Sequence, residues 1–290
     1  MLKTKKYNNG AASYPYVSAI IVAAGNSTRM GGVNKQFLLI DGVPVLIRTL
    51  KAFENSDLIK EIIISAREED IPQIFAMVKD YSVNKVSNIV KGGCTRQESV
   101  FNAVRCCMTE SDYIAIHDGA RPLVDRETIE KTIFAAFDFN AAAPGIPVKD
   151  TIKTVSDEGI VTSTPARDSL RAIQTPQVFN KKMYLSAMQG VPNSELFTDD
   201  CGLIEAYGKL VKIVDGDNTN IKITTPEDLI IAEAIINNCV HPDYRPLLTE
   251  YMNMGIKGHT PQNLKCSFAF HEELAATGDM HNVDWSKYAK

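Results

Sequence analysis

The sequence predicts an α/β fold with a mostly parallel, Rossmann-like sheet, flanking helices and a projecting β-hairpin arm. Between Ser18 and about Asn238, short apolar runs alternate with segments of helical periodicity, the pattern of a parallel sheet covered by helices. The first apolar run opens into a glycine-bearing loop, in which several backbone N–H groups are exposed. Two β-like runs, DTIKTV and GIVTST, flank a turn and predict the arm over about 148–170.

The elements follow one another in a regular order. Uninterrupted apolar runs predict buried strands at 19–24, 61–66, 88–90, 113–118 and 209–215. Helical spacing of apolar residues, with capping residues at several ends, predicts helices from about 44, 71, 95, 126, 181, 199 and 226. Thr95 and Glu98 form a capping box, and Gly208 is placed to end a helix. The stretch AAAPGIPV, with two prolines, is predicted to be less regular.

Length and composition suit one large domain with additional segments. The chain has 290 residues, of which 44% are hydrophobic, and a net charge of −4, which argues against general binding of nucleic acid. It has no apolar run long enough to span a membrane and no secretory signal. We therefore predict an N-terminal tail (1–17), one domain (18–238) and a C-terminal extension (239–290) of unknown role.

The cysteines indicate a reducing compartment. Six cysteines contain no C-x-x-C pair, and the histidines are scattered, so buried free thiols are favoured over a metal site. We expect a cytoplasmic protein, although a short transit-like segment at the N-terminus is compatible with the sequence.

The first glycine-bearing loop, AAGNSTRMGG, predicts a phosphate-binding site. A strand that ends in such a loop exposes backbone N–H groups, and Arg29 and Lys35 add positive charge nearby. The Walker pattern is excluded because Met30 stands where its second glycine is needed. The dinucleotide pattern fails at Ser27 and Met30, so the sequence disfavours a nicotinamide oxidoreductase.

Further candidates lie where other predicted strands end. Gly92 and Gly93 follow one strand, and Asp118 ends another, where a carboxylate could bind Mg²⁺ or simply cap a loop. His117 is interpreted as structural. Lys222 lies in the apolar-flanked sequence NIKIT, where a charged side chain is unfavourable unless it has a function.

Seven motifs occur in order: AAGNSTRMG…NKQF, GGCTRQESV, HDGARPLV, PVKDTIK, R-x-x-L-x-x-x-QTPQVF, TDD and N-x-K-I-T-x-PEDL. Together they closely resemble the cytidylyltransferases that act on 2-C-methyl-D-erythritol 4-phosphate in the non-mevalonate isoprenoid pathway. The resemblance covers residues 18–238. It implies a nucleotide-diphospho-sugar transferase type of fold, transfer of CMP from CTP with release of pyrophosphate, Mg²⁺ as cofactor, and a homodimer whose hairpin arms cross between subunits.

The resemblance also implies roles for individual residues. Those that would contact the nucleotide are Ala23, Ala24, Gly25, Gly93 and Ser99. Arg29 and Lys35 would bind the triphosphate, Lys222 the reacting α-phosphate, and Asp118 Mg²⁺. Those that would hold the acceptor are Arg121, Thr151, Arg167, Thr175 and Thr198. Two positions depart from the family: Asn34 replaces the usual proline, and Gly119 the usual alanine.

Other functions remain open at this point. A related cytidylyltransferase that uses ribitol 5-phosphate would keep the chemistry and change the acceptor. A non-catalytic nucleotide-binding scaffold would keep the fold alone, but such a protein should lose its charged positions first, and here they are retained.

Overall fold

The structure, a computed structural model, describes residues 14–25, 34–192 and 197–239. The chain divides into two compact units, Met1–Glu233 and Ala234–Lys290, and the strands described all belong to the first. Arg29 and residues 240–290 of the predicted C-terminal extension therefore lie outside the described residues.

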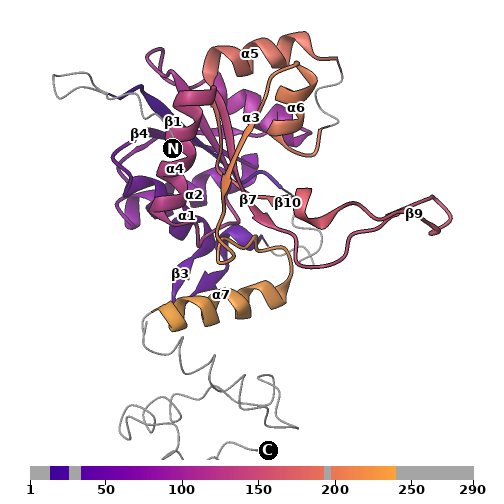
Figure 1. Ribbon diagram of the computed structural model, residues 1–290. Coiled ribbons are helices and arrows are strands. Elements are labelled where there is room, and N and C mark those ends of the chain that lie inside the picture. Colours follow the sequence, from indigo (N-terminus) through magenta and orange to yellow (C-terminus); the bar gives the residue numbers. More distant parts are fainter. Residues whose placement is uncertain (1–13, 26–33, 193–196, 240–290) are drawn as a thin grey trace, which may run out of the picture. The chain divides into compact units, whose positions relative to one another are not determined.

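A mixed, mostly parallel sheet of eight strands forms the centre of the first unit (Figure 1). Seven of them follow one another in the order β10-β7-β11-β6-β1-β4-β5, and β12 pairs with β7. The strands are β1 (Val17–Val22), β4 (Ile59–Ala66), β5 (Val86–Lys91), β6 (Tyr113–Asp118), β7 (Ala141–Pro147), β10 (Arg171–Ile173), β11 (Gln177–Asn180) and β12 (Lys212–Asp215). The β1–β4, β1–β6, β4–β5 and β7–β12 pairs are parallel, which confirms the predicted fold class.

Helices cover both faces of this sheet. They are α1 (Val45–Glu54), α2 (Ile71–Asp80), α3 (Arg96–Val104), α4 (Arg126–Phe139), α5 (Lys181–Gly190) and α6 (Asp200–Ala206). A further helix, α7 (Pro226–Cys239), begins in the first unit and ends in the second. Apolar residues of α1, α2 and α4 pack in one core cluster, and those of α3, α5 and α6 pack in the other. In β1, Ala19 and Ile21 face the first cluster and Ile20 the second, as the alternation of a strand requires.

Short elements connect these parts. Three 3₁₀ turns are described, η2 (Lys35–Phe37), η3 (Glu68–Asp70) and η4 (Arg167–Ser169), and one hairpin joins β2 (Leu39–Ile40) to β3 (Val43–Pro44). The predicted Asp41–Gly42 turn is confirmed, with φ of 47° and 72°. The predicted arm is also present: β8 (Thr154–Val155) pairs with β9 (Val161–Ser163), and the arm stands away from the main sheet (Figure 1).

The stretch AAAPGIPV is more regular than predicted. It forms β7, which pairs with β10, β11 and β12, and Ala141, Ala142 and Ala143 are fully buried. The carbonyl of Pro144 accepts a hydrogen bond from the Gln174 amide at 2.8 Å. Pairing with three neighbours and burial of the alanines outweigh the weak strand propensity of alanine and proline.

Several predicted boundaries differ slightly from the structure. The first strand begins at Val17 and ends at Val22, so Ala23 and Ala24 follow it rather than belong to it. The helix that Thr95 caps ends at Val104, before the two adjacent cysteines. Gly208 has a φ of 75° directly after α6 and its cap, as predicted for a helix-ending glycine.

Candidate functional site

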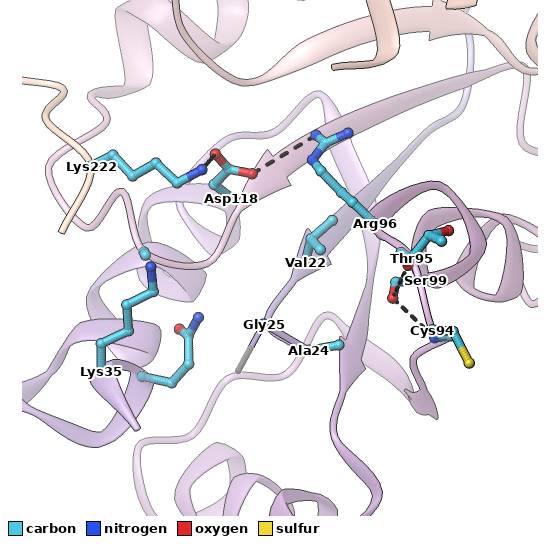
Figure 2. A pocket seen from close by; sticks show the side chains of 13 residues that line it. Val22, Ala24, Gly25, Lys35, Cys94, Thr95, Arg96, Ser99, Asp118 and Lys222 are labelled. Carbon is cyan, nitrogen blue, oxygen red and sulfur yellow. Dashed lines mark hydrogen bonds and ion pairs between the residues drawn. The ribbon is translucent and has the colours of Figure 1, made fainter. Parts of the chain in front are cut away.

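A cavity of about 390 Å³ lies at the carboxyl ends of β1, β5 and β6 (Figure 2). Ligands bind in such a position in open α/β sheets. Seven of the predicted site residues line it: Ala24, Gly25, Lys35, Gly93, Ser99, Asp118 and Lys222. Gln36, Thr95 and Arg96 also line it, although none of the three is predicted from the sequence to bind a ligand.

Asp118 is surrounded by cations. Its Oδ2 lies 2.7 Å from Nζ of Lys222 and 3.9 Å from Nε of Arg121, and its Oδ1 lies 3.8 Å from Nη2 of Arg96. Burial raises the pKa of the Asp118 carboxyl, but these three cations together lower it well below its usual range. The carboxylate is therefore ionised at neutral pH, and Lys222 and Arg96 approach it from opposite sides (Figure 2).

Arg96 connects the cavity to the protein core. Its Nη1 lies 2.6 Å from Oδ2 of Asp200, which is fully buried, and the hydroxyl of Tyr184 donates to Oδ1 of Asp200 at 2.7 Å. Burial lowers the pKa of Arg96, but the attraction of Asp200 and Asp118 outweighs burial and raises the pKa above its usual value. The guanidinium therefore remains charged. Backbone N–H groups of Asp200 and Cys201 donate to Oε1 of Gln177 and fix the start of α6.

The second glycine-rich segment forms a wall of the cavity. The Gly93 amide donates to Oγ of Ser99 at 3.0 Å, and Ser99 donates to the Thr95 carbonyl at 2.8 Å. A Cβ atom on Gly92 would lie 2.4 Å from the Cβ of Ala24, so only glycine lets the two segments approach. The predicted cap is confirmed, because the Thr95 side chain accepts from the Glu98 amide.

Lys35 enters the cavity from η2. Its Nζ donates to the carbonyl of Ile223 at 3.0 Å, which connects the first loop to the segment that carries Lys222. Asn34 caps η2, because its Oδ1 accepts from the Gln36 amide at 3.0 Å while its Nδ2 donates to Oδ2 of Asp70 at 2.7 Å. Asn34, which departs from the family pattern, thus fixes the start of the turn that carries Lys35.

Gly119, the second departure, follows Asp118 in a tight space. Its amide donates to the Val22 carbonyl at 2.9 Å. A Cβ atom there would lie 3.0 Å from Oε1 of Gln36 and 3.1 Å from the Val22 carbonyl oxygen. Glycine therefore leaves room for the buried Gln36 side chain beside the cavity.

His117 and Thr175 lie behind Asp118. Nε2 of His117 lies 3.2 Å from the carbonyl oxygen of Arg121, an acceptor, so Nε2 carries the proton and Nδ1 accepts from the Thr175 hydroxyl. The Thr175 oxygen in turn accepts from the Asp118 amide at 3.2 Å. Complete burial lowers the pKa of His117 to about 3, so the ring is neutral and structural, as predicted.

The remaining predicted residues lie outside this cavity. Ala23 is buried beside it, and Arg121 donates to the Asn220 carbonyl at 2.7 Å. Thr151, Arg167 and Thr198 are exposed, and Arg167 donates to the Lys149 carbonyl at 3.1 Å. The structure therefore brings together most of the described residues predicted to bind the nucleotide and the metal, but not all of the predicted acceptor residues.

The chain is similar to one family throughout the described unit. The family model for IspD, 2-C-methyl-D-erythritol 4-phosphate cytidylyltransferase, matches residues 17–238. A protein of that name from Caldanaerobacter subterraneus subsp. tengcongensis is 49% identical over 224 residues, which are 76% of this chain and 98% of the relative. Another from Bacillus thuringiensis is 44% identical over 220 residues, 75% of this chain and 96% of the relative.

Solved structures agree with these relatives. The crystal structure of 4-diphosphocytidyl-2C-methyl-D-erythritol synthase from Anaerococcus prevotii matches with a TM-score of 0.70 and 35% identity, and covers 77% of this chain and 96% of that one. The 2-C-methyl-D-erythritol 4-phosphate cytidylyltransferase from Thermus thermophilus matches with a TM-score of 0.60 and 29% identity, over 76% and 98%.

Proposed function

The chain belongs to the 2-C-methyl-D-erythritol 4-phosphate cytidylyltransferase family, and we propose that it transfers CMP from CTP to 2-C-methyl-D-erythritol 4-phosphate, with release of pyrophosphate. The observation that carries this proposal is the cavity at the end of the sheet, where one ionised carboxylate lies between Lys222 and Arg96, with Gly25 and Gly93 in the cavity lining. In the described part of the chain, no helix is long and apolar enough to cross a bilayer.

The chemistry needs charge neutralisation rather than a strong base. The acceptor attacks through a phosphate oxygen, and a phosphate monoester has a second pKa of about 6, so it is largely a dianion at neutral pH. One anion must then approach another at the α-phosphorus of CTP. Fixed cations stabilise the charge that gathers there and on the departing pyrophosphate. The neutral, buried His117 fits this scheme, because no proton has to be removed.

We assign the residues as follows. Ala23, Ala24, Gly25, Gly93 and Ser99 bind the nucleoside part of CTP, and Arg29 and Lys35 bind its triphosphate. Lys222 contacts the α-phosphate, which its place in the cavity beside Asp118 supports. The acceptor is held by Arg121, Thr151, Arg167, Thr175 and Thr198. Thr175 lies next to the Asp118 amide, and its hydroxyl is already hydrogen-bonded there and to His117.

Asp118 is the residue that would hold Mg²⁺. It is the one acidic side chain among the described residues that line the cavity, and Mg²⁺ commonly binds through one carboxylate plus substrate phosphates. Its ionised state suits a hard cation. When bound, the metal would neutralise phosphate charge at the reacting end of CTP.

We further propose a homodimer in which the arm of each subunit completes the site of the other. The arm exposes apolar side chains, among them Val155, Ile160 and Val161, with exposed fractions of 58%, 62% and 54%. Such a surface on a projecting hairpin favours a protein contact over solvent. Because both substrates are phosphorylated small molecules, a cytoplasmic location is consistent with this activity.

Pyrophosphate release from CTP tests the activity. We expect release with 2-C-methyl-D-erythritol 4-phosphate and Mg²⁺, and little with ribitol 5-phosphate. Lys222→Ala should fold normally and lose about a hundredfold or more in kcat, because removal of one such electrostatic group costs about 3 kcal/mol. Lys182→Ala, on the exposed side of α5, is the matched control and should retain activity.

Each contrary result has a distinct meaning. Release with ribitol 5-phosphate alone would change the acceptor. Binding of CTP without any release would favour a non-catalytic scaffold. Normal turnover in Lys222→Ala would remove Lys222 from the mechanism.

A further inference from the structure

We propose that Arg96 is an additional phosphate-binding cation for CTP, and that Tyr184 and Asp200 are positioning residues that hold its guanidinium toward the cavity. The proposal rests on the proposed function, since it assigns a nucleotide to this cavity. It begins from a set of buried polar groups that the mechanism above does not use.

Burial of the Asp200 carboxylate is costly. Its side chain is fully buried, and Tyr184, which contacts it, is also fully buried. Burying an ionised carboxylate is expensive, and a buried ion pair is rarely the best way to stabilise a core. Tyr184 and the neighbours of Asp200 in α6, Cys201, Leu203 and Ile204, belong to the second core cluster, so an apolar side chain at position 200 would extend that cluster at lower cost. This arrangement therefore favours a positional role over a stabilising one.

The contacts of Asp200 connect Tyr184 in the core to Arg96 at the cavity. The Tyr184 hydroxyl donates to Oδ1 of Asp200 at 2.7 Å, and Oδ2 of Asp200 accepts from Nη1 of Arg96 at 2.6 Å. On its other side, Nη2 of Arg96 faces Oδ1 of Asp118 at 3.8 Å across the cavity wall. The guanidinium is thus fixed at one edge by the core, while its other edge is directed toward the site (Figure 2).

The edge of Arg96 that faces the cavity is suited to a phosphate ligand. A separation of 3.8 Å from Asp118 is too long for a hydrogen bond, so the edge of Arg96 that faces the cavity retains donors for an incoming group. The planar guanidinium is suited to two-pronged contacts with phosphate. Arg96 and Lys222 lie on opposite sides of Asp118, and a phosphate close to that carboxylate would be within reach of both. We therefore expect a phosphate group of the nucleotide to bind between Arg96 and Lys222.

The decisive test uses Tyr184→Phe, which removes one hydroxyl from the core and leaves every side chain of the cavity in place. The loss of one hydrogen bond to a charged group should raise both Kd and KM for CTP about threefold to tenfold, with little change in KM for the acceptor. Arg96→Lys should weaken the binding of CTP further, because a single ammonium group cannot make the two-pronged contact of a guanidinium with phosphate. CTP binding is measured by calorimetry without acceptor, so that affinity is obtained independently of turnover.

Two controls separate positioning from stability. Ile204→Val removes a methyl group from the same core cluster and should lower the melting temperature without changing Kd for CTP. In an Arg96→Ala background, Tyr184→Phe should add nothing to the loss of affinity, since its effect passes through Arg96.

Two results would overturn the proposal. One is a folded Tyr184→Phe variant with wild-type Kd and KM for CTP, and the other is an equal effect of that substitution with and without Arg96. Failure of the proposed function is recognised separately, because the wild-type protein would then release no pyrophosphate or bind no CTP.

Discussion

At the scale of single residues, the charge of Asp118 is set by its neighbours. Burial alone would favour the protonated form, but Lys222, Arg96 and Arg121 outweigh it and lower the pKa of the carboxyl. The adjacent His117 is affected in a different way, since burial lowers its pKa to about 3 and keeps it neutral. Neither group changes its charge near neutral pH in the folded protein.

The acidic limb of the activity profile should therefore come from the substrate. We expect kcat/KM for the acceptor to fall below about pH 6, as its phosphate monoester takes up a second proton. A pH profile of pyrophosphate release measures this. An apparent pKa far from that of the acceptor, measured by phosphorus NMR, would assign the limb to a protein group instead.

Folding must be followed over the same pH range. The unfolded chain binds a proton at His117 near pH 6.5, whereas the folded protein binds it only near pH 3. Between these values the unfolded state holds more protons, so the free energy of unfolding decreases as the pH falls. Circular dichroism at each pH separates this loss of stability from protonation of the substrate.

Which site residues were predictable depended on how local their signals are. Asp118 ends a strand, Lys35 follows a glycine-bearing loop and Lys222 is flanked by apolar residues, and each of these signals is local in the sequence. Arg96 stood in a quoted motif, but its function depends on Asp200, which is 104 residues away along the chain. No periodicity or spacing connects the two, and the fold alone brings them together.

At the scale of elements, η2 shows how a short turn positions a cation. Asn34 precedes Lys35 with a φ of −71°, a value that proline also adopts. Its side chain is held by Asp70, which Arg67 binds through two contacts of 2.7 and 3.0 Å. Hydrogen bonds therefore provide at this position the rigidity that a proline ring would give.

Two substitutions at position 34 test this interpretation. Asn34→Ala loses the cap and the contact with Asp70 and should raise KM for CTP, with a stability loss of about 1 kcal/mol. Asn34→Pro should retain an affinity for CTP closer to wild type, because it fits the observed φ. Steady-state kinetics and thermal melts compare them. If the proline variant is the weaker of the two, backbone rigidity is not what position 34 supplies.

The elements also show where local propensity misleads. β7 contains three alanines and two prolines, a composition that argues against a central strand, yet it pairs with three neighbours. Small side chains fit between α4 and the opposite core cluster, and this requirement is visible only once the sheet is assembled. By contrast, β1, β4 and β6 were predictable because their apolar runs are buried on both faces.

At the scale of the whole molecule, the predicted site is divided between two places. Seven residues predicted to bind the nucleotide or the metal line one cavity, whereas Thr151 is exposed at the start of the arm. The exposure of Thr151, which we propose to bind the acceptor, is explained if the arm serves a second subunit. The symmetry of a two-fold dimer would then give two equivalent sites, each built from both chains.

Mixing two inactive variants tests whether sites are shared. Lys222→Ala removes a cavity cation, and Thr151→Ala alters the arm. If the arm of each subunit completes the other site, a mixed dimer contains one site with both defects and one with neither. Random exchange of subunits should then restore about a quarter of the wild-type sites. If each chain builds its own site, pyrophosphate release after mixing stays at the average of the two variants, whatever the oligomeric state measured by light scattering.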